Sequence, residues 1–250
     1  MKCTSIRFGI ILACSLFVSL NTYGQSIGIY LSPSFSSHFL SAIDHDQPDR
    51  DSIAKMDRAD FRWNAGFGVK LPIDKDWALQ TGVELRNYGF LRVWEDLQYL
   101  DSIHPDIGRV EDLSNNGIKV ADYHYRYTYL SIPLLFHRDI SSRKYRHTYQ
   151  FSIFLGPRFQ FLFNEKLDIF LQGFSVEGEF DHELEYTPYN PAEFNVAFSM
   201  GGRAQIRLDS DWVLSAQPFL DTQILRSGED GFVKFNLNQF GLDVGINYEF

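Results

Sequence analysis

The feature that most constrains the fold is an alternation of apolar and polar residues with a period of two. In residues 61–71, FRWNAGFGVKL, every odd position is apolar and every even position is charged, polar or glycine. Successive side chains of a β-strand point to opposite faces, so this period predicts a strand with two different faces. Two classes fit it: a soluble barrel with its apolar face inward, and a membrane barrel with its apolar face toward lipid.

Similar alternation along the chain predicts eight strands. Their ranges are 26–36, 61–71, 77–85, 123–136, 149–163, 194–208, 212–220 and 240–250. The connections differ in length: the short ones are 72–76, 137–147 and 209–211, and the long ones are 37–60, 91–122, 165–193 and 226–234. An even number of antiparallel strands joined in this way is the pattern of an outer-membrane barrel with short periplasmic turns and long outer loops.

One predicted strand changes phase. Residues 123–136, YHYRYTYLSIPLLF, alternate through Tyr123, Tyr125 and Tyr127, and the apolar residues then move to the even positions from Leu130 onward. One extra residue near Tyr129 would bring both sets onto one face, and a β-bulge is such an insertion. We therefore expect a bulge in this strand, with the three tyrosines on its apolar face.

Three features favour the membrane barrel over the soluble one. The interior of an eight-stranded barrel is just wide enough for its own side chains, so the many Phe and Trp residues of the apolar face would overfill it. Glycines on the polar face make room inside for long neighbours, whereas on a wet surface they would only weaken the strands. The chain ends on Phe250 with apolar residues at every second position before it, which resembles the last strand of outer-membrane barrels. Aromatic residues near strand ends also fit the girdles at membrane interfaces. These are Trp63, Trp77, Trp212, Tyr248 and Phe250.

The first 24 residues predict a secretory signal peptide. Lys2 and Arg7 precede an apolar run over residues 8–20, and small residues before Gln25 fit a cleavage site. Both cysteines, Cys3 and Cys14, lie in this segment; cleavage before Cys14, as in a lipoprotein, would leave too short an apolar run. We expect residues 25–250 to form one barrel domain without cysteine, which excludes disulfides and thiol catalysis.

The mature chain is acidic. Without Lys2 and Arg7 it has 21 basic and 32 acidic residues, a net charge of −11. Nucleic-acid binding needs basic patches, so no nucleic-acid partner is expected. No histidine pair has metal-ligand spacing, and DHDQPDRD (44–51) lacks the glycine and spacing of a calcium loop. We expect no cofactor and no metal site.

The polar face predicts a charged network inside the barrel. Mixed charges in a narrow interior must be paired and hydrogen-bonded, because an isolated buried charge is very costly. The structural interpretation is a plug, and the alternative is a proton or ion path. The predicted network consists of Arg62, Lys70, Glu84, Arg86, Arg158, Arg203, Arg207, Asp221, Asp243 and Glu249.

An enzyme acting on lipid or protein at the barrel rim is a further alternative. Barrel enzymes that act on lipid use His with Ser or a carboxylate near the outer rim, and His124 is the best placed histidine, close to where a long loop enters its strand. No G-x-S-x-G motif is present. We therefore expect a protein without enzymatic activity.

The long connections carry most of the negative charge. They hold 6, 7, 8 and 2 acidic residues, 23 of the 32, against nine basic residues. EGEFDHELE (177–185) is the densest part, and it is either a solvated loop or hairpin extension or a recognition surface. Oxygen ligands suit Ca²⁺ and Mg²⁺, so divalent bridging to lipopolysaccharide and docking of a basic partner are both open. The acidic residues concerned are Glu177, Glu179, Asp181, Glu183 and Glu185.

Four stretches resemble the PorT-like family of outer-membrane β-barrel proteins: YLSIPLLF (129–136), FLGPRF (154–159), FGVKLPIDKDWALQTGVEL (67–85) and GLDVGINYEF (241–250). The resemblance implies an outer-membrane barrel, and one branch of that family assists protein secretion across the outer membrane. Ser131 stands where the family often has Glu, and the first strand lacks the usual Gly- and Asn-containing start, so membership in that branch stays open.

Together these patterns predict an all-β, eight-stranded antiparallel transmembrane barrel in the outer membrane, with a filled interior. Its expected role is structural or interactive, through acidic outer loops, with an accessory role in secretion as an extension; the alternatives are a rim enzyme and a narrow channel. The expected partners are outer-membrane lipid and lipopolysaccharide, a protein at the outer loops, and the barrel-assembly machinery. Ile246, Tyr248 and Phe250 are the predicted assembly signal.

Overall fold

The computed structural model describes residues 25–43, 57–95, 118–141, 148–173, 177–182, 191–227 and 233–250. These residues form strands joined by turns, and no helix long and apolar enough to cross a membrane occurs among them. The strands are β1 (Ser26–Ile43), β2 (Asp57–Pro72), β3 (Trp77–Glu95), β4 (Ile118–Asp139), β5 (Tyr149–Gly173), β6 (Glu177–His182), β7 (Phe194–Arg207), β8 (Trp212–Gln223) and β9 (Val233–Glu249).

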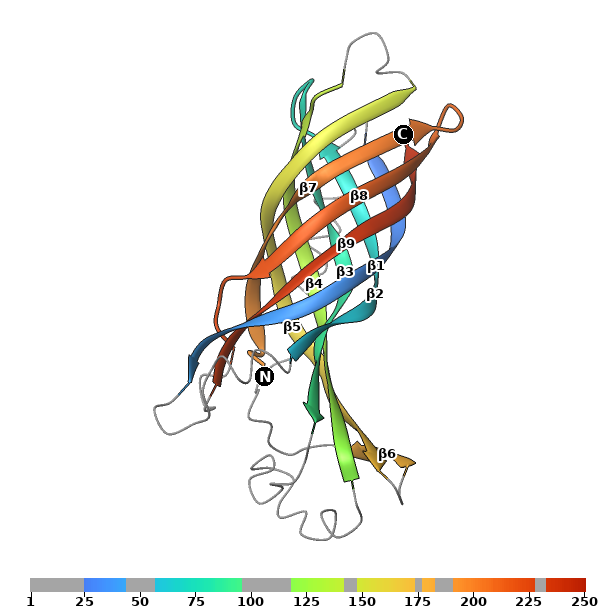
Figure 1. Ribbon diagram of the computed structural model, residues 1–250. Coiled ribbons are helices and arrows are strands. Elements are labelled where there is room, and N and C mark those ends of the chain that lie inside the picture. The colour runs from blue at the N-terminus through green and yellow to red at the C-terminus, as the bar shows by residue number, and fades with distance from the viewer. Residues whose placement is uncertain are drawn as a thin grey trace, which may run out of the picture.

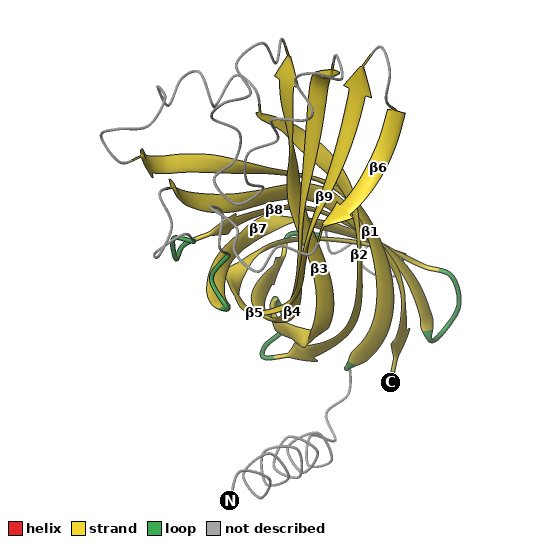
Figure 2. Ribbon diagram, turned by 90° about the horizontal axis from the view of Figure 1, so that it is seen from below, coloured by secondary structure: helices red, strands yellow, loops and turns green. Residues whose placement is uncertain are grey.

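Eight of these strands close into an antiparallel barrel (Figures 1 and 2). The sheet order is β4-β3-β2-β1-β9-β8-β7-β5-β6, and an additional pairing of β4 with β5 completes the ring. β6 pairs with β5 outside the ring. The first and last strands pair from Ser26 opposite Glu249 to Ile43 opposite Val233, with one register shift, so no edge opens toward lipid at the closure. The predicted fold class is confirmed.

Four neighbouring strands extend beyond the rest of the barrel at its long-loop end. β3 and β4 stay paired out to Glu95 opposite Val120, and β4 and β5 out to Ile118 opposite Gly173. β6 adds to the outer part of β5, from Leu167 opposite His182 to Gln172 opposite Glu177. The resulting projecting sheet is seen at the lower end of Figure 1. Part of the connection predicted over 165–193 is therefore a hairpin extension.

The apolar face of the strands is the outer wall. Trp63 is 58% exposed and Leu155 is 53% exposed, although both are large and apolar. A wall of this kind is stable only against lipid, since soluble proteins rarely expose such a continuous apolar surface. Val69 is an exception: it lies on the same face of β2 as Trp63 but is buried. Aromatic contacts gather at both ends of the wall: Phe35–Phe61–Trp63 at the long-loop end and Trp212–Tyr248–Phe250 at the short-turn end.

The phase predicted for β4 is wrong. Tyr123, Tyr125 and Tyr127 point into the barrel, where Tyr125 is 1% exposed, and the alternation continues without a break through Ser131 to His137. The register does shift next to Tyr129, but the extra residue is Phe163 on β5. The tyrosines pack inside because aromatic rings fill this end of the barrel: Phe90 stacks on Tyr125 with ring centroids 4.5 Å apart.

A second irregularity lies in the wall between β2 and β3. Their ladder is interrupted between Ala59 and Ala65, where β2 has one residue more than β3. Side chains take over the hydrogen bonds there: Asn64 Oδ1 accepts from the backbone N–H of Asn87 at 2.8 Å, and Gln239 donates to the Asn87 carbonyl at 2.8 Å. This seam therefore depends on specific side chains rather than on backbone pairing.

Candidate functional site

The centre of the barrel interior is a cluster of five fully or almost fully buried charged side chains, here called the central cluster. Arg86 Nε donates to Glu84 at 2.7 Å, and its two Nη atoms lie 3.9 Å from Asp221 and 3.4 Å from Asp243. Arg158 donates to Glu84 and lies 3.3 Å from Asp221. Three carboxylates face two guanidinium groups, so the cluster is nearly neutral, which is what burial of charge requires.

Neutral groups complete the central cluster. The Ser32 and Ser199 hydroxyls donate to Asp243 and Asp221, respectively, and the Tyr30 hydroxyl donates to Glu84. Tyr30 reaches Glu84 by lying across Gly66, where an added Cβ would stand 2.4 Å from the ring. Gly66 is therefore needed for close approach, since any side chain there would displace the tyrosine.

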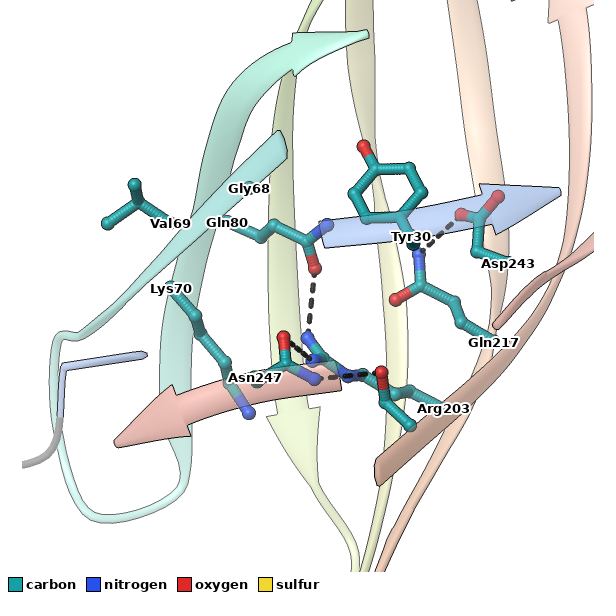
Figure 3. Close-up of a pocket in the computed structure, with 10 residues that line it drawn as sticks. Tyr30, Gly68, Val69, Lys70, Gln80, Arg203, Gln217, Asp243 and Asn247 are labelled. Atoms are coloured by element: carbon teal, nitrogen blue, oxygen red, sulfur yellow. Dashed lines mark hydrogen bonds between the residues drawn. The ribbon is translucent and has the colours of Figure 1, made fainter. Parts of the chain in front are cut away.

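On the short-turn side of the central cluster, the interior becomes basic. Figure 3 shows Arg203 between Gln80 and Asn247, whose side-chain oxygens accept from its two Nη atoms at 3.1 Å each. Among the described residues no carboxylate oxygen lies within 4 Å of this guanidinium. A cavity of about 20 Å³ separates Arg203 from Asp243 and is also lined by Lys70. It has room for about one water molecule.

A larger cavity opens at the short-turn end and is here called the mouth cavity. Its volume is about 290 Å³. Lys70, His137 and Gln205 are among the residues that line it, and the Lys70 ammonium donates to Gln205 Oε1 at 3.2 Å. Arg207 and Glu249 form an ion pair at its edge, with both side chains partly exposed.

Arg62 does not join the central cluster. Its guanidinium pairs with Asp60 and donates to the carbonyl of Tyr125 at 3.3 Å, beside Gly89 at the seam between β2 and β3. The other nine predicted network residues line the interior, but they form separate groups: the central cluster, Arg203 and Lys70 on its short-turn side, and the Arg207–Glu249 pair at the mouth. The interior is thus divided into layers, and the alternation of residues along each strand does not show which layer a residue belongs to.

The long-loop end of the interior is closed by aromatic and amide side chains. Gln160 donates to the Tyr88 hydroxyl at 2.7 Å and accepts from Gln223 at 2.9 Å. Further out, Arg92 forms a bidentate pair with Asp57 at 2.6 and 2.8 Å. His38 lies 3.0 Å from Asp57.

The proposed rim histidine, His124, lies beside a carboxylate. Its Nδ1 is 3.8 Å from Asp60 Oδ2, a separation longer than the 2.6–3.2 Å or so of a working acid–base pair. Asp60 is already paired with Arg62, as described above. The arrangement therefore does not by itself assemble a catalytic site. Among the described residues no group of three or more His, Cys, Asp or Glu side chains is arranged to hold a metal ion.

The predicted acidic recognition residues are only partly within the described residues. Glu177, Glu179 and Asp181 alternate along β6, and Glu183 and Glu185 lie outside the described residues, as does the predicted signal peptide over 1–24. Ile246, Tyr248 and Phe250 lie at the barrel closure; Ile246 pairs with Ile29 and Leu214, and the Phe250 N–H donates to the Gln25 carbonyl at 2.9 Å. These positions fit the predicted assembly role, which stays a prediction.

Sequence reasoning missed several interior residues. Tyr30 stands on the polar-phase positions of β1, so the same alternation that identified Arg62 would have found it. Leu135, Phe154 and Phe219 also stand on the inward-facing positions of their strands, but they are apolar, so a search for polar residues on that face missed them; they form a small apolar core inside the barrel. Arg86 stacks on the Phe219 ring, 4.5 Å from its centroid, so these apolar residues also support the central cluster.

Comparisons with known proteins agree with this architecture. No curated protein matches the chain. Three solved structures are similar to it: Neisserial surface protein A (9% identity, 90% of this chain and 97% of that one, TM-score 0.40), OprG of Pseudomonas aeruginosa (10%, 91% and 96%, 0.44) and Ail of Yersinia pestis (12%, 90% and 99%, 0.31). At these TM-scores the similarity carries no functional argument. The model of the family described as outer membrane protein beta-barrel domain matches residues 23–250. The chain therefore belongs to the outer membrane protein beta-barrel domain family and is a protein of the outer membrane.

Proposed function

We propose that this protein is a non-enzymatic, closed barrel that anchors a recognition surface outside the cell. The observation that carries the proposal is the projecting sheet. Beyond the register shift at Tyr129, β4 stays paired with β5 from Thr128 out to Ile118, with one further shift between Val120 and Ile118, and β6 widens this sheet. Strands that only cross a bilayer need about 9–11 residues, so this part of the sheet serves a purpose outside the membrane.

A closed interior supports an anchoring role rather than transport. Arg86 and Arg158 are fully buried and cross-link carboxylates from β3, β8 and β9 in the middle of the barrel. Of the two interior cavities described above, the larger is the mouth cavity, which lies at one end. A path for ions would require this cluster to separate, at a cost of several kcal/mol for each broken buried pair. We therefore favour a plug over a narrow channel.

β6 is the strand at which recognition is proposed to occur. It is the last strand in the sheet order, so within the described residues its second edge has no strand partner. An exposed edge accepts an extended segment by main-chain pairing, and alternate side chains then provide specificity. Glu177, Glu179 and Asp181 stand at alternate positions of β6. The partner proposed is accordingly an extended basic segment, and divalent bridging to lipopolysaccharide uses the same carboxylates.

Two finer assignments are also proposals. The PorT-like resemblance suggests that the recognised partner belongs to a secretion apparatus, which would make the protein an accessory to secretion. Residues 1–24 are proposed to be a signal peptide that is removed during export.

The test removes the recognition surface and keeps the barrel. Deletion of residues 175–187, or neutralisation of Glu177, Glu179, Asp181, Glu183 and Glu185 together, should leave a folded barrel but release partners that co-purify with the intact protein. A rising salt concentration should release the same partners from the intact protein, since exposed charges are screened over about 8–10 Å.

The matched control neutralises Asp74 and Asp76, which are exposed in the turn between β2 and β3 at the opposite end. This control should retain the partners. Equal partner recovery from intact, deleted and control proteins at every salt concentration would refute the recognition role of β6.

A further inference from the structure

The outer wall changes character toward the long loops, where apolar side chains give way to charged ones. On β4 the outward-facing positions are apolar from Phe136 to Leu130, and the next two outward-facing residues are Thr128 and Arg126. Lys166 stands directly opposite Arg126 on β5, so the two side chains lie on the same face of the sheet. Both cations are therefore at the edge of the apolar band, the level at which lipid headgroups begin.

Arg62 reaches the same outer face through the seam between β2 and β3. Gly89 lies between Tyr88 and Phe90, whose side chains are buried inside the barrel, so a side chain at Gly89 would point outward. A Cβ there would stand 2.6 Å from Arg62 Nη2. Because Gly89 is the register partner of Arg126, the two guanidinium groups lie on one outer surface. Arg62, Arg126 and Lys166 are here called the outer cations.

The outer cations are exposed, whereas the carboxylate that two of them share is covered. Arg126 Nη1 lies 2.8 Å from Asp168 Oδ2, and Lys166 Nζ lies 2.9 Å from Asp168 Oδ1. The side chains of Arg126 and Lys166 are 43% and 38% exposed, but that of Asp168 is only 1% exposed. Arg62 is paired with Asp60. Three cations thus share two carboxylates, and the accessible part of the group is positive.

The neighbouring charges leave this positive surface in place. Arg58 and Asp122 stand further out on the same face and add one charge of each sign. The carboxylates of β6 begin on the far side of β5, where Asp181 is the register partner of Asp168. A phosphate group that approaches from the lipid along β3 and β4 therefore meets guanidinium groups first.

An apolar hollow of about 750 Å³ lies in the wall on the membrane side of the outer cations. It crosses β9, β1, β2 and β3, and Ala65 contributes a small side chain between Leu31 and Leu85, its partners on the two neighbouring strands. Leu85 is four residues from Gly89, which is about 13 Å along β3 and about 10 Å toward the bilayer centre at a strand tilt of about 40°. One leaflet has about 15 Å of hydrocarbon, so the hollow lies at the depth of outer-leaflet acyl chains.

We propose that this surface binds one phosphorylated lipid of the outer leaflet, the lipid A part of lipopolysaccharide. A phosphate group of the lipid lies at the outer cations, and one of its acyl chains lies in the hollow. Guanidinium groups suit the phosphate because they donate two parallel hydrogen bonds to its oxygens. A lipid uses the cations and the hollow together, whereas a free phosphate would use only the cations. The site does not include β6 and is independent of the recognition proposed there.

The test titrates the folded mature protein in detergent with diphosphorylated lipid A and follows the bound lipid by native mass spectrometry. Parallel titrations use lipid A without phosphate groups and phosphatidylglycerol. Arg126→Gln removes one outer cation and leaves Asp168 paired with Lys166, so the barrel should still fold. Its affinity for lipid A should be about tenfold lower, the effect of a lost charged hydrogen bond. Ala65→Phe should lower the affinity as well, because its ring occupies the hollow.

Two matched controls change the same residue types elsewhere on the outer wall. Arg138→Gln removes an exposed arginine that stacks on Trp77 at the short-turn end, 5.6 Å from the ring centroid. Ala204→Phe adds a ring on β7, away from the strands that form the hollow. Both controls should bind lipid A as the unaltered protein does. Folding of every variant is checked by its change in gel migration on boiling, and Lys166→Gln replaces Arg126→Gln if the latter fails to fold.

The outcomes decide the proposal directly. Binding that requires the phosphate groups, and that Arg126→Gln and Ala65→Phe weaken while the controls do not, supports the site. Equal binding of lipid A with and without phosphate, tighter binding of phosphatidylglycerol, or unchanged affinity in either variant overturns it.

Discussion

Replacement of Arg86 by Met is the most direct test of the central cluster. Arg86 contacts Glu84, Asp221 and Asp243, and no part of its side chain is exposed. Methionine keeps much of the apolar stem but leaves three buried carboxylates facing Arg158 alone. Removing one partner of a buried ion pair typically costs about 3–5 kcal/mol. Because Arg86 serves three carboxylates, we expect a loss at or above that range.

The assay is urea unfolding of the protein in detergent micelles or lipid vesicles, followed by tryptophan fluorescence and by gel migration without boiling. The matched control is Arg207→Met, because the Arg207–Glu249 pair is about one-third exposed on the arginine side. Surface pairs contribute about 0–1 kcal/mol, so this control should change the free energy of unfolding little.

A second variant separates charge from packing. In the double variant Arg86→Met with Glu84→Gln, one of the unpaired carboxylates is removed, so the loss should be smaller than the sum of the two single losses. If Arg86→Met unfolds within about 1 kcal/mol of the unaltered protein, or if the two single losses simply add, the charges do not act as a unit and the reasoning is refuted.

Three other outcomes are expected. Phe250→Asp should sharply lower the amount of assembled protein, measured in outer-membrane fractions, because the closing strand ends there; Phe250→Tyr should assemble normally. Asn64→Leu should cost about 1–3 kcal/mol in urea unfolding, since it leaves the Asn87 N–H unsatisfied at the seam. Burial by itself raises the pKa of Asp57, but hydrogen bonds from His38 and Arg92 outweigh burial and lower that pKa below its ordinary value. The Asp57 carboxylate, held by His38 and Arg92, therefore stabilises the long-loop end of the barrel at pH values above the ordinary Asp pKa. This stabilisation is lost as the pH falls from the ordinary pKa through the lowered pKa of Asp57 in the folded protein. Proteolysis of the long-loop end should accelerate over that pH range, and Asp57→Asn should remove the acceleration.

The sequence by itself determined the class of the fold and the facing of most strands. A period of two leaves only one register of faces compatible with lipid, because a one-residue slip would turn Lys70 and Arg86 outward. The count of eight barrel strands follows from the same period and from turns such as 72–76. The closing role of β9 was also predictable, because its apolar residues repeat to the last position of the chain.

Only the tertiary structure decided which charges meet. Parity places a side chain inside the barrel, but its partners depend on the relative heights of strands that are far apart in sequence. Arg86 meets Asp243, 157 positions away, and Lys70 meets Gln205, 135 positions away. For this reason ten residues predicted as one network separate into a central cluster, a basic layer and a mouth pair, and Arg62 lies at a seam whose extra residue shifts β2 against β3.

The tyrosines of β4 show the limit of pattern reasoning most clearly. Tyrosine is amphipathic, so alternation through Tyr123, Tyr125 and Tyr127 fits either face of a barrel strand. The choice was made by packing: at the long-loop end the interior is filled by rings such as Phe90 and Phe235, and tyrosine completes that layer. The mouth cavity was hidden for a related reason, because its lining residues His137 and Gln205 come together only when the barrel closes and brings β4 and β7 to one cavity.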